Sequence, residues 1–270
     1  MGVKLMKLMQ GDCLTLMKEL EDNSVDLICC DLPYGTTACK WDKMIPLDAL
    51  WEQYERILTE TGTAVLFANG MFEAKLIASN LPLFKYRWVW VKNKTTNFVH
   101  AKNRPMVKSE DILVFSKGSM GHKSQLGNKR MTYNPQGLVP CGKVVKAGKN
   151  KFGTVAGVRP SHKSEYVAEY TNYPCDVLEF SEPTKKLHTS EKPVELLTYL
   201  INTYSNEGDT VLDNCMGSGS AGVACVNRNF IGMELNEDYF KIACERLNYV
   251  INHVRKTPSF SYGDISTYIR

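Results

Sequence analysis

Residues 210–234 read TVLDNCMGSGSAGVACVNRNFIGME, and this stretch indicates the fold class. Its apolar beginning at 210–213 predicts a strand, and the glycine-rich residues 214–220 predict a tight turn. A helical pattern follows at 221–228, and a second apolar run at 230–234 predicts another strand. Because a strand–helix–strand unit places its two strands parallel in one sheet, the chain is predicted to be an α/β protein.

The N-terminal part of the chain repeats this pattern. Apolar runs at 25–30 and 62–68 predict two more strands, and residues 47–58 between them have helical spacing. This second unit again favours a parallel sheet. The remaining predicted elements are strands at 86–91 and 111–115, interpreted as an antiparallel hairpin at one edge of the sheet, and helices at 191–204 and 238–254.

Positive charge gathers in the middle of the chain. Between Lys92 and Lys163 there are 15 lysines or arginines and two acidic residues, while the rest of the chain has a net charge of −9. Such segregation is typical of a nucleic-acid-binding segment joined to an enzyme core, although a solvated basic loop is the alternative. Periodicity fades at 117–186, so an insertion with little regular structure is expected. Candidate DNA contacts are Lys102, Arg104, Lys129, Arg130 and Lys151.

The cysteines and the hydropathy bear on location. The nine cysteines form no CxxC pair and show no zinc-site spacing, so no metal is expected. They are interpreted as free thiols of a reducing compartment. No run approaches the ~18 apolar residues that span a bilayer. The sequence therefore predicts a cytoplasmic protein without a membrane partner.

A glycine motif marks a candidate cofactor site. Gly217, Gly219 and Gly222 follow the spacing G-x-G-x-x-G between a predicted strand and helix, and Glu234 ends the next strand. Glycines let the backbone approach a ligand, and a carboxylate at this point can accept both ribose hydroxyls. A nucleotide-like cofactor is expected, and NAD and S-adenosylmethionine both fit; a glycine turn without a ligand is the alternative.

A second candidate site, Asp31-Leu-Pro-Tyr34, directly follows a buried strand, at the sheet edge where α/β proteins bind ligands. Pro33 stiffens the turn, leaving the Asp31 carboxylate and the Leu32 carbonyl as neighbouring acceptors for the two N–H bonds of an amine. Tyr34 offers a flat face for a base. Asp31 would also stabilise positive charge developing on a methylated amine. The alternative is a tight turn with a surface tyrosine.

Together these residues resemble the amino-methylating DNA methyltransferases, with motifs [DNS]PP[YFW] and DPFxGSGT. Here the motifs are Asp31–Tyr34 and Asp213–Ser220, and their order, with the basic insertion between them, resembles the permuted β group. The 11–13 and 188–193 segments are similar to flanking motifs of that family. Leu32 replaces a proline, and 214–216 departs from Pro-Phe-x, which weakens an expected aromatic contact to the cofactor.

The resemblance implies a Rossmann-like, mostly parallel sheet with helices on both faces and an inserted target-recognition region. It divides the chain into a catalytic half at 1–94, the basic insertion at 95–187 and a cofactor-binding half at 188–270. The expected catalytic residues are Asp31, Leu32, Pro33 and Tyr34. The expected S-adenosylmethionine-binding residues are Asp12, Cys13, Asp31, His188, Thr189, Ser190, Lys192, Asp213, Met216, Gly217, Ser218, Gly219, Ser220, Glu234 and Leu235.

The resemblance further implies methyl transfer to N6 of adenine in double-stranded DNA, because an Asp-led motif is typical of adenine enzymes. Cytosine N4 and an RNA or protein amine are the alternatives in the same class. An NAD-dependent oxidoreductase would leave the basic segment and the Asp31 turn without a role, and a DNA-binding protein without catalysis would not need both motifs. A bacterial or phage origin, a homodimer and a cognate restriction enzyme are also implied.

Overall fold

The computed structural model describes residues 5–36, 42–121, 127–146, 165–188 and 190–253, without the side chains of 251–253. The chain forms two compact units, one of residues 1–134 with 176–270 and the other of residues 135–175. The first unit contains an eight-stranded sheet in the order β1-β10-β9-β2-β3-β5-β4-β8. Its strands are β1 (Met6–Gln10), β2 (Val25–Cys30), β3 (Leu58–Ala68), β4 (Phe84–Thr96), β5 (Val107–Ser116), β8 (Val177–Glu179), β9 (Thr210–Asp213) and β10 (Asn229–Glu234).

The sheet is mostly parallel, as predicted. Every described pair of neighbouring strands is parallel except those that involve β5, which runs antiparallel to both β3 and β4. The antiparallel hairpin at one side of the sheet is therefore confirmed, although β8 adds a further strand beyond β4. Both central βαβ units are also confirmed.

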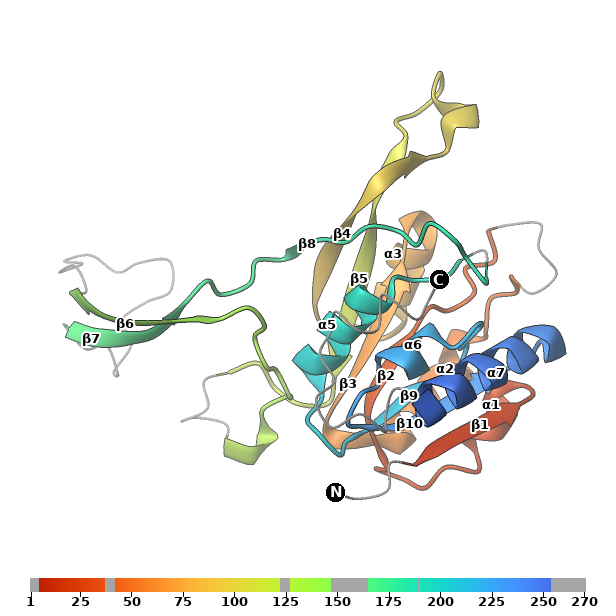
Figure 1. Ribbon diagram of the computed structural model, residues 1–270, viewed down its shortest axis with the longest axis horizontal. Helices are drawn as coiled ribbons and strands as arrows, with labels where there is room; N and C mark the ends of the chain where they lie inside the picture. Colours follow the sequence, from red (N-terminus) through yellow and green to blue (C-terminus); the bar gives the residue numbers. More distant parts are fainter. Residues whose placement is uncertain (1–4, 37–41, 122–126, 147–164, 189, 254–270) are drawn as a thin grey trace. The chain divides into compact units, whose positions relative to one another are not determined.

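The core lies on both faces of the sheet. Along β2, Leu27 and Cys29 pack into one hydrophobic cluster, whereas Ile28 and Cys30 pack into the other. Successive strand side chains point to opposite faces, so the continuous apolar run is a strand buried on both sides. One face is covered by α5 (Val194–Tyr204), α6 (Ser220–Ala224) and α7 (Glu237–His253), and the other by α1 (Cys13–Met17), α2 (Leu47–Ile57) and α3 (Gly70–Ser79), as Figure 1 shows.

Helix α6 is shorter than predicted. It ends at Ala224, whereas the sequence pattern continues to Arg228. The backbone leaves helical geometry at Cys225, and Asn227 has a φ of +63°, so the helix cannot propagate. The Arg228 guanidinium instead reaches the backbone carbonyl of Ser205 at 3.1 Å, a tertiary contact that helical periodicity does not reveal.

The described part of 117–186 contains more regular structure than the sequence pattern predicts. The second unit contains an antiparallel hairpin of β6 (Val139–Lys146) and β7 (Glu165–Thr171), and β8 joins the main sheet. The side chains of this hairpin are mostly exposed. Apolar alternation is weak in such strands, which explains why the sequence pattern missed them. None of the described helices is long and apolar enough to cross a membrane.

Candidate active site

A cavity of about 990 Å³ opens at the carboxyl ends of the central strands. In the sheet, β10 lies on one side of β9 and β3 lies on the opposite side of β2. The connections that leave β9 and β2 therefore run in opposite directions across the sheet, and the boundary between β9 and β2 is a topological switch point. Open α/β sheets bind ligands at such a switch point. Asp31 follows β2, Asp213 ends β9 and Glu234 ends β10, and all three line the cavity.

The glycine turn lies against the end of β10. Glu234 accepts a hydrogen bond from the Gly217 amide at 2.9 Å and another from the Asn236 amide at 2.8 Å. Burial raises the pKa of Glu234, and these backbone amides oppose the shift. Gly217 has a φ of +50°, and a Cβ there would lie 3.6 Å from the His188 ring. The turn thus brings its backbone to the cavity at Gly217.

The other two glycines face the protein interior. Gly219, which was expected beside the cofactor, does not line the cavity. It has a φ of +81°, and a Cβ there would lie 3.2 Å from Leu247 of α7. At Gly222 a Cβ would lie 2.7 Å from Phe230 and 2.8 Å from Leu247. These glycines therefore allow close packing of helix and strand.

A buried acid, Asp213, and two thiols, Cys13 and Cys215, form another part of the wall. Asp213 accepts a hydrogen bond from the Cys215 amide at 3.1 Å, and burial raises its pKa to about 7. Cys215 hydrogen-bonds with the thiols of Cys13 and Cys30, and burial contributes to the raised pKa of all three. Thiols with raised pKa values are uncharged and poorly nucleophilic, so Cys13 and Cys215 act as apolar groups in the wall.

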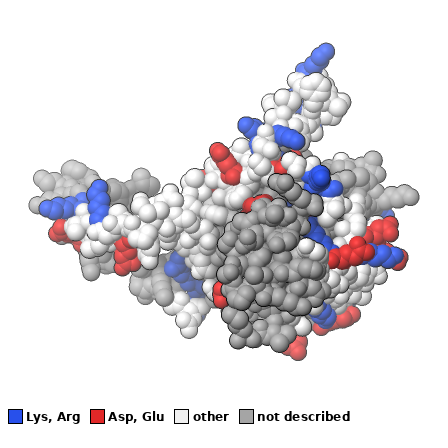
Figure 2. Space-filling view, in the orientation of Figure 1, with Lys and Arg blue, Asp and Glu red and all other residues white. Residues whose placement is uncertain are grey.

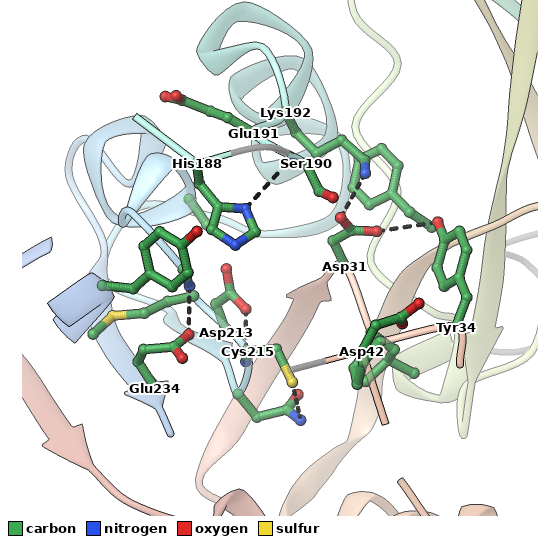
Figure 3. A pocket seen from close by; sticks show the side chains of 18 of the residues that line it. Asp31, Tyr34, Asp42, His188, Ser190, Glu191, Lys192, Asp213, Cys215 and Glu234 are labelled. Atoms are coloured by element: carbon green, nitrogen blue, oxygen red, sulfur yellow. Dashed lines mark hydrogen bonds and ion pairs between the residues drawn. The ribbon is translucent and has the colours of Figure 1, made fainter. Parts of the chain in front are cut away.

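The Asp31 turn is part of a buried network of charges (Figure 3). The Lys192 ammonium lies 2.6 Å from Asp31. It also lies 3.3 Å from Glu110 of β5. Tyr34 donates to Glu110 at 2.7 Å or to Asp31 at 3.1 Å, and its ring stacks on Phe72 with the centroids 4.7 Å apart. Three segments distant in sequence thus hold Asp31 and Tyr34 in one geometry.

The charges in this network shift each other's pKa. Burial raises the pKa of Asp31, and Lys192 opposes that shift. Burial alone would also raise the pKa of Glu110, but Lys192 and Lys92 lower it to about 2. Burial would lower the pKa of Lys192, yet Asp31 and Glu110 raise it well above the ordinary value. Lys192 therefore stays protonated and favours the ionised form of Asp31.

The segment before α5 closes the cavity on another side. His188 contacts Tyr239 with ring centroids 4.2 Å apart, and its Nδ1 accepts from the Ser190 amide at 3.2 Å. Burial lowers the pKa of His188. Glu191 anchors the segment, because it accepts hydrogen bonds from Ser220 at 3.0 Å and from Arg246 at 2.8 Å.

The structure brings most of the expected site residues together. Thr189 and Lys151 lie outside the described residues. Lys102 and Arg104 lie in the exposed tip between β4 and β5, whereas Lys129 and Arg130 lie in a different exposed segment at η2 (Gly127–Lys129). The expected residues that line the cavity are Asp12, Cys13, Asp31, Leu32, Pro33, Tyr34, His188, Ser190, Lys192, Asp213, Met216, Gly217, Ser218, Ser220, Glu234 and Leu235.

Sequence reasoning missed Glu110, Lys92 and Phe72, whereas Tyr239, the last residue of a G-x-E-x-x-x-x-Y pattern that resembles the family's ribose-binding motif, does line the cavity. Glu110 is 5% exposed and was counted only as one of two acids in a basic segment. That isolation was the available signal, because a carboxylate that becomes buried needs a cation beside it. In the described parts of the chain, no group of three His, Cys, Asp or Glu is arranged to hold a metal ion.

A switch-point cavity with a glycine turn, a strand-end carboxylate and an acidic turn defines a Rossmann-like, nucleotide-cofactor-binding enzyme. The family model described as DNA methylase, N6_N4_Mtase, matches residues 25–245. The chain therefore belongs to the DNA methylase family. This confirms the resemblance drawn from the two motifs.

Individual relatives agree with this assignment. Type II methyltransferase M.HpaI of Haemophilus parainfluenzae is 28% identical over 91% of this chain and 75% of its own length. DNA adenine methyltransferase YhdJ of Escherichia coli is 26% identical over 96% of this chain and 90% of its own length. The crystal structure of the M1.HpyAVI–SAM complex matches with a TM-score of 0.60 and 22% identity, covering 90% of this chain and all of that chain. At this identity the structural match supports the fold.

Proposed function

We propose that this DNA methylase transfers a methyl group from S-adenosylmethionine to N6 of adenine in double-stranded DNA. The observation that carries the proposal is that the Asp31 turn and the glycine turn with Glu234 line one cavity. An amine acceptor and a nucleotide-type site are thus adjacent, as methyl transfer between two bound substrates requires.

The cavity fits S-adenosylmethionine on the chemistry of its walls. Glu234 presents a carboxylate beside the Gly217 backbone, a suitable acceptor for ribose hydroxyls. Asp12 caps α1 through Thr15 at 2.9 Å while lining the cavity, which places a second acceptor near β1. His188 and Tyr239 provide an aromatic wall. Bound here, the sulfonium would supply an activated methyl group.

The proposed chemistry depends on Asp31. Its carboxylate and the Leu32 carbonyl would accept the two amine N–H bonds of the target base and direct the nitrogen lone pair toward the methyl group. Tyr34, held by Phe72 and Glu110, would stack on the extruded base. Lys192 would keep Asp31 ionised to offset the positive charge that develops on nitrogen.

DNA contacts are proposed for the basic residues outside the cavity. Lys102, Arg104, Lys129, Arg130 and Lys151 would neutralise phosphates, and the 95–187 insertion would recognise the target, between catalytic residues 1–94 and cofactor-binding residues 188–270. A homodimer, a cognate restriction enzyme and a cytoplasmic location remain predictions.

Two observations favour adenine over cytosine N4. The motif begins with Asp31, and one relative is named as an adenine methyltransferase. The test is to incubate the enzyme with methyl-labelled S-adenosylmethionine and unmethylated duplex DNA, RNA or protein, and to identify the labelled product by mass spectrometry. Labelled N6-methyladenine from DNA supports the proposal. Labelled N4-methylcytosine would refute the adenine assignment, and label in RNA or protein alone would refute the DNA substrate.

A further inference from the structure

The β4–β5 hairpin displays two exposed apolar side chains whose exposure is not explained by the cavity or by the proposed phosphate contacts. Its two strands pair Trp90 with Glu110 at the cavity and continue to the pair Thr96 and Val107. Thr96 itself lines the cavity. Figure 1 shows the hairpin running out beyond the other strands of the main sheet. The tip of the hairpin, residues 97–106, thus begins at the outer end of the cavity.

Two apolar side chains are displayed at this tip. Phe98 is 81% exposed and Val99 is 88% exposed, in the short η1 turn (Phe98–His100). The turn is ordered by backbone hydrogen bonds, because the amides of His100 and Ala101 donate to the carbonyls of Asn97 and Phe98, both at 3.0 Å. The backbone therefore holds both side chains away from the protein, although burying them would be favourable.

The charge around these side chains identifies the partner class. Residues 93–109 contain four lysines or arginines and no acidic residue. Figure 2 shows positively charged and uncharged surface at the tip of the hairpin. An apolar point on a surface whose charged side chains are all basic suits a partner with a polyanionic exterior and a stacked apolar interior, which describes duplex DNA.

We infer that Phe98 and Val99 form a wedge that enters the duplex where the target base leaves the stack. This inference rests on the proposed function. Extruding a base leaves an apolar gap between the neighbouring base pairs, and filling that gap with an aromatic ring offsets the lost stacking. The cavity that would receive the base and the wedge that would replace it lie at successive points along the same hairpin.

The test uses two duplexes that differ in the cost of base extrusion. The methylated site is first located by sequencing genomic DNA treated with the parent enzyme. One synthetic duplex then carries this site fully paired, and the other has an abasic nucleotide opposite the target base. Single-turnover methylation is measured at saturating DNA and S-adenosylmethionine for the parent and for the double variant Phe98→Ala with Val99→Ala.

If the wedge is present, the double variant should methylate the paired duplex at least about tenfold more slowly than the parent, because unstacking costs a few kcal/mol. The wedge predicts a rate within about threefold of the parent on the abasic duplex, where the target base is already unpaired. Leu81→Ala is the matched control, since Leu81 is 63% exposed near the opposite end of β4, and it should leave both rates unchanged. Lys102→Ala with Arg104→Ala should weaken binding of both duplexes equally.

If the double variant loses the same factor in methylation rate on both duplexes, or loses none on either, the wedge is overturned. The proposed DNA methylation would not be affected by that result. Unchanged methylation rates combined with Phe98-dependent binding to phosphatidylserine vesicles would also overturn the wedge, in favour of a lipid surface. A parent enzyme that methylates neither duplex nor genomic DNA would refute the proposed function, and the wedge with it.

Discussion

Replacing Lys192 with methionine tests the buried charge network directly. The substitution keeps an unbranched side chain, one heavy atom shorter, and removes its charge. The Lys192 ammonium lies 2.6 Å from Asp31 and is 10% exposed, so water replaces the lost interaction poorly. Removing one partner of a buried ion pair costs about 3–5 kcal/mol, because the other charge is left buried without compensation.

The expected kinetic effect follows from the pKa of Asp31. Burial already raises that pKa, and removing Lys192 should raise it further because the opposing positive charge is lost. Since the ionised carboxylate is the active form, turnover at neutral pH should fall, and the acidic limb of the pH–rate profile should move to higher pH. If the whole 3–5 kcal/mol falls on the transition state, turnover drops by about 10²–10⁴.

Single-turnover methyl transfer to duplex DNA is measured from pH 5 to about 10, with calorimetric affinity for S-adenosylmethionine and thermal unfolding recorded in parallel. Lys186→Met is the matched control, because Lys186 lines the same cavity but pairs with Glu182 at 3.6 Å. A variant that loses activity without moving the acidic limb would show that Lys192 has only a structural role. An unchanged rate would refute its coupling to Asp31.

Three further predictions follow from the site. Asp31→Ala should lower single-turnover methyl transfer by about 10²–10³ while leaving affinity for cofactor and DNA nearly unchanged, and a parental rate would exclude this turn as the active site. Glu234→Ala should weaken calorimetric binding of S-adenosylmethionine by about 1–3 kcal/mol, and unchanged affinity would reject its ribose role. Neutralising Lys129 and Arg130 together should weaken DNA binding for all sequences and flatten its salt dependence, whereas a parental salt slope would show that neither contacts phosphate.

Several parts of the fold could be predicted because their signals are local. The strands at 25–30 and 210–213 agree with β2 and β9 to the residue, since short apolar runs bounded by turns are typical of strands buried on both faces. The β6–β7 hairpin of the second unit was missed because its exposed strands lack a buried face. Local periodicity cannot reveal a strand that does not alternate between core and solvent.

By itself the sequence determined the α/β class, the position of the two motifs at the carboxyl ends of predicted strands and the candidate roles of Asp31 and Glu234. These features depend on which residue types follow a strand at a fixed spacing, and that spacing can be read directly from the sequence. Only the tertiary structure paired Asp31 with Lys192, 161 residues away, and Tyr34 with Glu110, 76 residues away. It also turned Gly219 toward α7 instead of the cavity. Such contacts arise from the order in which strands pair and helices pack, which a local sequence pattern does not contain.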